Sequence, residues 1–282
     1  MCPRCVERTK APLGRQPWFV AVCGIVTFGG YYLAHLDTVP ISGRRRFIDI
    51  TPKQEAMIAQ VAYDSIIEEV RHAMNFLPDD HPDVIVIRKV AQRLIRATGL
   101  TGLNWEIHVV ASSTPNAFVL PGGKIFVYTG ILPIMRDEDG VAAVLGHEIA
   151  HQVARHSAEK FTFTKARIVV RCSLTLVGAQ SGRRYAVAST PLMRIMRAGL
   201  ELPFSRKCET EADQVRSGLM AQACFDPTAA IDVWKRMEKA HGHRGIEYMS
   251  THPRNDSRVR NFERWMPEAQ ERRAQSDCNS GT

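Results

Sequence analysis

The pentapeptide HEIAH, residues 147–151, places two histidines four positions apart and a glutamate directly after the first. At about 100° per residue in a helix, His147 and His151 lie only ~40° apart around the axis, so both imidazoles can reach one metal ion. Glu148 is rotated about 60° from His151 on the other side, too far to be a ligand but near enough to contact a water held by the metal. The pattern predicts a catalytic zinc site; the alternative is an ordinary amphipathic helix with solvent-facing histidines.

Such a site is suited to hydrolysis. Zinc accepts imidazole nitrogens and lowers the pKa of a bound water toward ~7, which makes hydroxide available at neutral pH. Glu148 would act as the general base, because it can take a proton from that water and later deliver one to a leaving amine. The expected reaction is therefore the cleavage of a peptide bond by zinc-activated water.

A second motif, SRKCETEAD at residues 205–213, supplies a third metal ligand. Glu209 and Asp213 are four residues apart and share one helix face, whereas Glu211 points away. Glu209 would complete a His-His-Glu set and leave the fourth position open for water. Asp213 could accept a hydrogen bond from the second nitrogen of a ligand histidine. An acidic surface helix is the alternative, but two motifs in the expected order favour the zinc site.

The elements that must position these residues can be predicted from capping and periodicity. Thr51 to Gln54 form a capping box before a helix that extends to about residue 76. A second helix is predicted over 83–97 and a third, which contains HEIAH, from 137 to about 156. Residues 105–110 read as a strand, and 116–132 as two strands joined by a turn at 121–123. These patterns predict an α+β fold, mostly helical, with a small β-sheet.

The predicted hairpin over 116–132 has two possible roles. It can be plain scaffold, or it can form a sheet edge beside the active site that pairs with an extended peptide. The order of the elements does not choose between them.

The N-terminus is predicted to anchor the chain in a membrane. Residues 1–17 form a basic leader, compatible with part of a mitochondrial presequence. Residues 18–36 contain no acid, Lys or Arg and would reach about 28 Å as a helix, close to the thickness of a bilayer's hydrocarbon core. We predict one transmembrane helix there. A secretory signal peptide is the alternative, but no small-residue cleavage site follows, and basic residues on both sides leave the topology open.

Charge and cysteine content limit the classes of partner and compartment. The chain is 45% hydrophobic with a net charge of +8, and it carries no nucleic-acid-binding signature. Residues 161–200 contain seven basic residues and no acid, which fits either contact with anionic lipids or a solvated loop. The seven cysteines are an odd number, so a disulfide framework is not expected, and the C-x-x-C pair of Cys2 and Cys5 has no second pair to complete a zinc site. The polar tail, 270–282, is predicted to be disordered.

The order of these motifs resembles the membrane-associated gluzincin family, which includes HtpX-like and prenyl-protein peptidases. The resemblance is closest to a mitochondrial inner-membrane branch whose activity overlaps that of the m-AAA protease, and it covers roughly 31–269. The segments that carry it are VPISGRRRF (39–47), NAFVLPGGKIFVYTGIL (116–132), HEIAH with ARH (154–156), LPFSRK (202–207), SRKCETEAD, STHPRNDSR (250–258) and WMPEA (265–269).

The resemblance implies a gluzincin-type zinc peptidase domain over 37–269, with one Zn²⁺ per chain. Its ligands would be His147, His151 and Glu209, with Glu148 as the general base. His252 and Arg258 match the family's His-Pro…Arg segment and are candidates for gating the zinc or for stabilising the tetrahedral oxyanion. The residues alone would place them in a turn before a helix.

The resemblance also implies a location and a substrate class. The catalytic domain would face the intermembrane space and cleave membrane or membrane-proximal proteins in quality control, and it could form a homo-oligomer. An HtpX-like or prenyl-protein peptidase would need several membrane spans. An inactive membrane scaffold would not need Glu148, and a structural zinc protein would need a fourth protein ligand, for which His252 is the nearest candidate.

Overall fold

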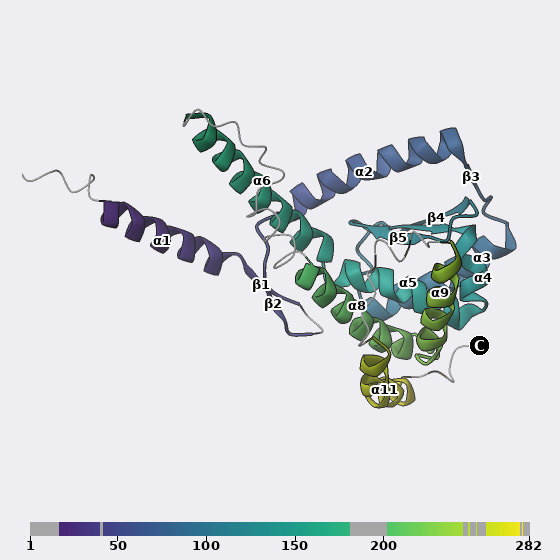
Figure 1. The fold of residues 1–282 in the computed structure, drawn as a ribbon. Coiled ribbons are helices and arrows are strands. Elements are labelled where there is room, and N and C mark those ends of the chain that lie inside the picture. The colour runs from purple at the N-terminus through teal and green to yellow at the C-terminus, as the bar shows by residue number, and fades with distance from the viewer. Residues whose placement is uncertain are drawn as a thin grey trace, which may run out of the picture.

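The computed structural model describes residues 17–39, 42–180, 202–244, 248, 252, 258–276 and 278 (Figure 1). The leader up to residue 16, with Cys2 and Cys5, and residues 181–200 of the basic stretch lie outside this description. The fold is α+β and mostly helical, as predicted. The helices are α1 (Pro17–Ala34), α2 (Pro52–Ala73), α3 (Pro82–Thr98), α4 (Leu132–Met135), α5 (Glu138–Val153), α6 (His156–Gln180), α8 (Leu202–Gln222), α9 (Ala229–Arg244) and α11 (Arg258–Gln275). The strands are β1 (Leu36–Thr38), β2 (Arg45–Phe47), β3 (Asn75–Phe76), β4 (Glu106–Ala111), β5 (Ala117–Leu120) and β6 (Lys124–Tyr128).

Local sequence sets the bounds of the first helices of the body. Thr51 caps α2 in the predicted capping box: its side chain accepts from the backbone of Gln54, and the Gln54 side chain accepts from the backbone of Thr51. Gly99 ends α3 in the left-handed conformation, with φ 69°. These two predicted boundaries are confirmed within about two residues.

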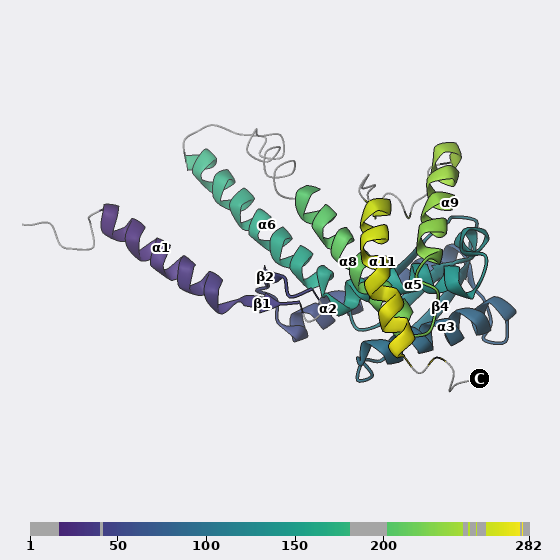
Figure 2. The same cartoon turned by 90° about the horizontal axis from the view of Figure 1, so that it is seen from below.

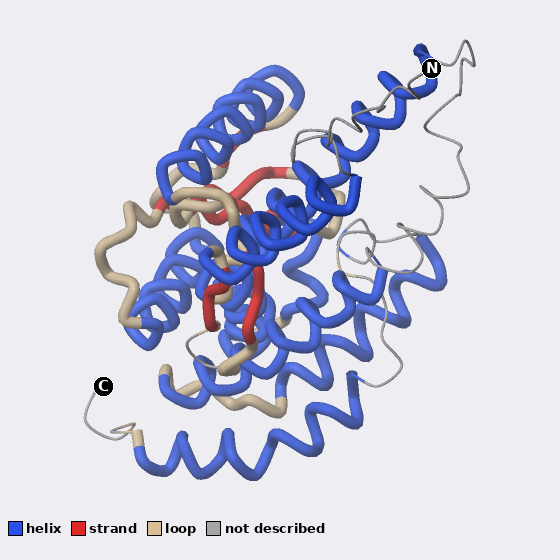
Figure 3. The backbone as a smooth tube through the Cα atoms, turned by 90° about the vertical axis from the view of Figure 1, so that its left-hand side faces the viewer, coloured by secondary structure: helices blue, strands red, loops and turns tan. Residues whose placement is uncertain are grey.

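A four-stranded sheet with the order β3-β4-β6-β5 forms the β part of the body (Figure 3). β4 and β6 are parallel, while β5 and β6 form the predicted antiparallel hairpin. The turn of the hairpin requires glycine, because Gly122 and Gly123 have φ of 91° and 90°. A Cβ on Gly123 would also lie 2.9 Å from the Trp105 ring.

The sheet lies between α2 and α5 (Figure 1), with a hydrophobic cluster on each of its faces. On one face, α2 places Val70 against Val110 and Phe126. The other face packs on α5, which is itself enclosed by α3, α8 and α9. Residues 140–150 of α5 are therefore all buried, and a stretch that is mostly apolar all round suits such a position.

Helices α1 and α6 project from the same side of the body (Figures 1 and 2). Asp49, just after β2, ties them together: it accepts from the Tyr31 hydroxyl at 3.0 Å and from Lys165 at 2.8 Å. In the part of the chain that the structure describes, no helix combines the length and mean hydropathy that crossing a membrane requires. The transmembrane helix predicted over 18–36 corresponds to α1, and its crossing of a membrane is not confirmed.

The prediction of a disordered tail over 270–282 is wrong for its first residues. Helix α11 continues to Gln275 because it packs along α8 and buries Phe262 and Ala269. Cys278 then forms a disulfide with Cys224, 54 residues earlier. Sequence spacing does not reveal this pair, because only the return of α11 along α8 brings the two cysteines together.

Candidate metal centre

Helix α5 holds the HEIAH motif in the centre of the body. His147 is fully buried, and Glu148 is only 2% exposed. Asp137 caps the helix, because its side chain accepts from the backbone of Gly140. Gly146 allows α8 to approach the helix closely. A Cβ at Gly146 would lie 3.2 Å from Cγ of Arg216 on α8. Close packing of α5 on α8 thus brings the two predicted motifs together.

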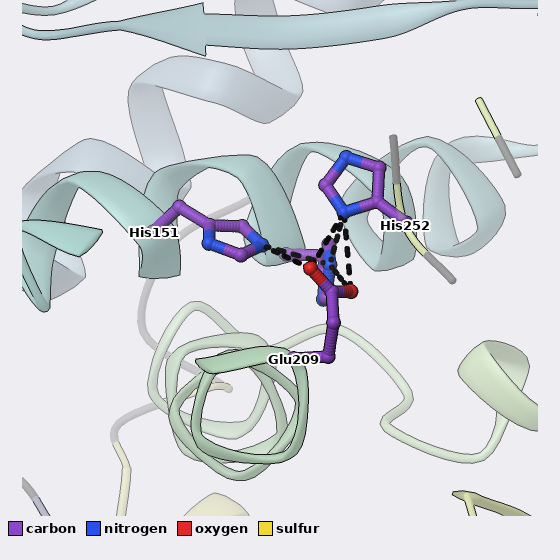
Figure 4. Close-up of side chains that lie close together, drawn as sticks. His151, Glu209 and His252 are labelled. Carbon is purple, nitrogen blue, oxygen red and sulfur yellow. Dashed lines mark hydrogen bonds and ion pairs between the residues drawn. The ribbon is translucent and has the colours of Figure 1, made fainter. Parts of the chain in front are cut away.

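The predicted ligand atoms converge on one point (Figure 4). The Nε2 atoms of His147 and His151 are 3.1 Å apart, and Glu209 Oε2 lies 3.2 Å from His147 Nε2. His252 joins this group, and all four ligand atoms lie within 4.8 Å of one another. Imidazole nitrogens and a carboxylate are the donors that zinc takes, so these residues fit a zinc ion.

The surroundings of His151 and Glu209 favour the protonation states that a metal needs. At His147, by contrast, burial is outweighed by Asp213 and Glu209, which raise the pKa of the imidazole. Burial lowers the pKa of His151 well below its usual value, which favours the neutral imidazole. Burial opposes ionisation of Glu209, but the neighbouring His252 and His147 hold the pKa of its carboxyl well below the usual range. Neutral imidazole and ionised carboxylate are the forms that coordinate zinc.

Asp213 contacts the second ring nitrogen of His147, the one that faces away from the other ligands, as the sequence predicts. Its Oδ1 lies 3.0 Å from His147 Nδ1, close enough to interact although the approach is not aligned as a hydrogen bond. Arg258 in turn donates to Asp213 from Nε at 2.5 Å and from Nη2 at 2.7 Å. Burial opposes the ionised form of Asp213, but Arg258 and Arg216 lower the pKa of its carboxyl below the usual range. An ionised acceptor beside Nδ1 favours coordination of a metal through Nε2.

Glu148 faces the same space from the other side and is held by a residue that sequence reasoning missed. The Tyr248 hydroxyl donates to Glu148 Oε1 at 2.9 Å, and the Tyr248 ring stacks on His252 with centroids 4.4 Å apart. Tyr248 lies four residues before His252, and the His252 backbone N–H donates to the Tyr248 carbonyl. The one signal for Tyr248 in the sequence is its position four residues before His252 of the His-Pro segment.

His252 and Arg258 are both close to the centre but in different positions. His252 Nδ1 lies 3.1 Å from both carboxylate oxygens of Glu209 and 3.3 Å from His147 Nε2. It therefore stands where a fourth ligand would. Arg258 is 1% exposed, pairs with Asp213 and lies over the Trp234 ring at 3.7 Å. Its Nη2 also lies 3.6 Å from Glu209 Oε2, and its predicted roles at the zinc stay predictions.

Comparison with known proteins agrees with this site. Residues 85–266 match the sequence model of Peptidase family M48. The chain belongs to peptidase family M48. It is a metalloendopeptidase whose metal-site residues His147, His151 and Glu209 are all present.

Several relatives of the chain are mitochondrial proteins. The chain is 47% identical to the mitochondrial metalloendopeptidase OMA1 of Schizosaccharomyces pombe, over 98% of this chain and 80% of the relative. It is 40% identical to the Saccharomyces cerevisiae OMA1, over 90% of this chain and 76% of the relative. Its identity to the human OMA1 is 31%, over 98% of this chain and 55% of the relative. The resemblance to a mitochondrial branch of the gluzincins is thereby confirmed.

Proposed function

We propose that this metalloendopeptidase is zinc-dependent, belongs to the mitochondrial inner membrane and cleaves membrane or membrane-proximal proteins in quality control. Its catalytic side would face the intermembrane space. The observation that carries the zinc dependence is the convergence of His147, His151 and Glu209 at one buried point. The mitochondrial relatives support the location.

The chemistry follows from the groups around that point. His147, His151 and Glu209 would hold the zinc ion, which when bound would lower the pKa of a water and polarise the scissile carbonyl. Glu148 then acts as general base, and the Tyr248 hydroxyl fixes its carboxylate on Oε1. Glu148 later carries the proton to the departing amine.

Strand β5 is the proposed docking edge for the substrate backbone. Among the strands that the structure describes, β5 pairs with β6 alone, so its second edge has no strand beside it. β5 also packs against α5, the helix that carries HEIAH. An extended peptide added to this edge would lie next to the metal centre, which favours the docking role of the hairpin over that of plain scaffold.

Removal of the metal tests the zinc dependence. We expect the purified protein to contain about one zinc per chain and to lose cleavage of an unfolded substrate when a chelator removes the ion. Added zinc should restore cleavage by the wild type. Glu209→Ala should not retain zinc, and added zinc should not give it cleavage activity. Full activity after complete removal of zinc would contradict the proposal.

Apolar surfaces on α1 and α6 are the proposed membrane contacts. Ile25 on α1 is 72% exposed, and Val169 on α6 is 58% exposed, on two helices that project from the same side of the body. The basic residues of 161–200 would add attraction to anionic head groups, at about 1 kcal/mol each near the surface.

Flotation with liposomes tests this contact. We expect more protein to float with anionic than with neutral liposomes, and added salt to reduce the difference. A variant in which four arginines become glutamine should lose the preference: Arg183, Arg184, Arg194 and Arg197. A control variant of equal net charge should keep it, with the changes at Arg71, Arg96, Arg260 and Arg264. Equal binding to both kinds of liposome would favour the solvated loop.

His252 is proposed to gate the metal. Four protein ligands close a zinc site, whereas three leave a position for water, and His252 Nδ1 stands at the fourth position. We expect His252→Ala to lower zinc affinity while hydrolysis of a short unstructured peptide rises. Titration with a zinc chelator and peptide assays measure the two effects, with His72→Ala on the exposed face of α2 as the control. A loss of hydrolysis by about 10²–10³-fold would instead assign His252 to the oxyanion.

A further inference from the structure

A series of polar contacts, buried at His156 and Glu211, connects the metal centre to the turn between β1 and β2. We propose that Arg44, Glu211 and His156 are positioning residues for His151, so that the β1–β2 turn supports the metal site. This inference rests on the proposed zinc site and extends it to a segment more than 100 residues before the HEIAH motif in the chain.

The first link is a contact between two histidines. His156 Nδ1 lies 2.8 Å from His151 Nδ1, with the rings at 72° to each other. Arg155, with φ of 48°, makes the turn between α5 and α6 that directs His156 back toward α5. A side chain in the left-handed region is uncommon, so this turn is set by its surroundings rather than by local preference.

The direction of this hydrogen bond follows from the metal site. His151 Nε2 faces His147 and Glu209, at 3.1 Å and 3.5 Å from their nearest ligand atoms. If Nε2 coordinates zinc, Nδ1 must carry the hydrogen and donate it to His156 Nδ1. His156 then carries its own hydrogen on Nε2, which lies 2.9 Å from Glu211 Oε2. In this series of contacts, every hydrogen-bond donor therefore faces an acceptor.

The second link fixes the Glu211 carboxylate. Arg44 donates to Glu211 Oε2 from Nε at 3.0 Å and from Nη2 at 2.8 Å, and the Ser42 hydroxyl donates to Oε1. Glu211 is 5% exposed and His156 is also 5% exposed, so water does not compete at either contact. The three acids of the CETEAD stretch thus serve both ligand histidines: Glu209 as a ligand, Asp213 behind His147, and Glu211 behind His151 through His156.

A simple structural ion pair is the competing explanation, and the structure offers a matched control for it. Arg44 also pairs with Glu159, from Nη1 at 2.8 Å and from Nη2 at 2.7 Å. Among the described residues, Glu159 makes no hydrogen bond to His156. Glu159→Gln therefore removes one carboxylate from Arg44 but leaves the contacts from Arg44 to Glu211 and from Glu211 to His156 in place.

The test measures zinc affinity of the full chain by competition with a chromophoric chelator. We expect His156→Ala and Glu211→Gln to weaken zinc binding by about 10–100-fold, the usual cost of losing a group behind a metal ligand. Arg44→Gln should also weaken it, whereas Glu159→Gln should stay within about twofold of the wild type. His156→Asn should recover part of the loss, because its amide oxygen can accept from His151 Nδ1.

Thermal stability of the metal-free proteins separates the two explanations. Both Glu211→Gln and Glu159→Gln should lower thermal stability, because each removes a carboxylate partner of Arg44, but only Glu211→Gln should lower zinc affinity. Equal zinc affinities for these two variants would overturn the proposal. An unchanged zinc affinity in Arg44→Gln would show that the β1–β2 turn does not support the metal site. Absence of zinc from the wild type would instead overturn the proposed zinc site itself.

Discussion

Glu148→Gln is expected to abolish proteolysis while the zinc stays bound. Glutamine has nearly the same size and can still contact Tyr248, but its amide cannot take a proton from the attacking water. Glu148 is 2% exposed and accepts from the Tyr248 hydroxyl at 2.9 Å, so the substitution should leave the surrounding packing in place. Loss of a general base typically costs 10²–10⁴-fold, and we expect a fall of about that size.

The measurement compares zinc content and cleavage of an unfolded substrate, side by side, for the wild type and the variant. Glu159→Gln, the same substitution on α6, serves as the control and should cleave normally. Equal zinc with activity lost only in Glu148→Gln would assign the base. Retained activity would remove Glu148 from the mechanism, while zinc without activity in either protein would indicate a closed gate or a structural metal.

The residues of the metal centre that share a helix could be predicted from the sequence. His147 and His151 need only the geometry of one turn, and Glu209 with Asp213 needs the same geometry on a second helix. The caps at Thr51 and Gly99 are equally local, because each is satisfied by atoms within a few residues. These features depend on short-range hydrogen bonds and helical periodicity, which the sequence displays directly.

The parts that escaped prediction depend on contacts between distant segments. Tyr248 reaches Glu148 across 100 residues, and Arg44 reaches Glu211 across 167 residues. Neither has a spacing that marks its partner. The polar end of α11 is wrongly predicted to be disordered because contacts between distant segments decide its structure as well. Packing on α8 stabilises this helix, and composition alone does not show that packing.

The role of Glu211 shows how a correct local inference can be incomplete. Helical spacing correctly separates it from the face shared by Glu209 and Asp213. Helical spacing does not show which residue Glu211 contacts, because only the turn at Arg155 places His156 beside it. Periodicity gives the direction of a side chain, while the partner it meets is decided by the packing of the whole domain.

Arg258→Met is expected to cause a large loss of stability. The Arg258 guanidinium and the Asp213 carboxylate are each 1% exposed and joined by two hydrogen bonds. Removal of one partner leaves a buried carboxylate with Arg216 Nη2, at 3.2 Å, as its remaining cation. Breaking a buried pair in this way typically costs 3–5 kcal/mol, and we expect the free energy of unfolding to fall by about that amount.

Urea unfolding of the metal-free protein measures this loss, and a double variant identifies its cause. Arg258→Met combined with Asp213→Asn removes both charges of the pair but leaves the buried Arg216 without its carboxylate partner. We therefore compare its loss with the sum of the losses in Arg258→Met and Asp213→Asn, and expect it to be smaller than that sum. A loss of less than about 1 kcal/mol in the single variant would mean that Arg216 suffices to neutralise Asp213. If the two single losses simply add in the double variant, the loss in Arg258→Met comes instead from the packing of Arg258 on Trp234, because that contact does not depend on Asp213.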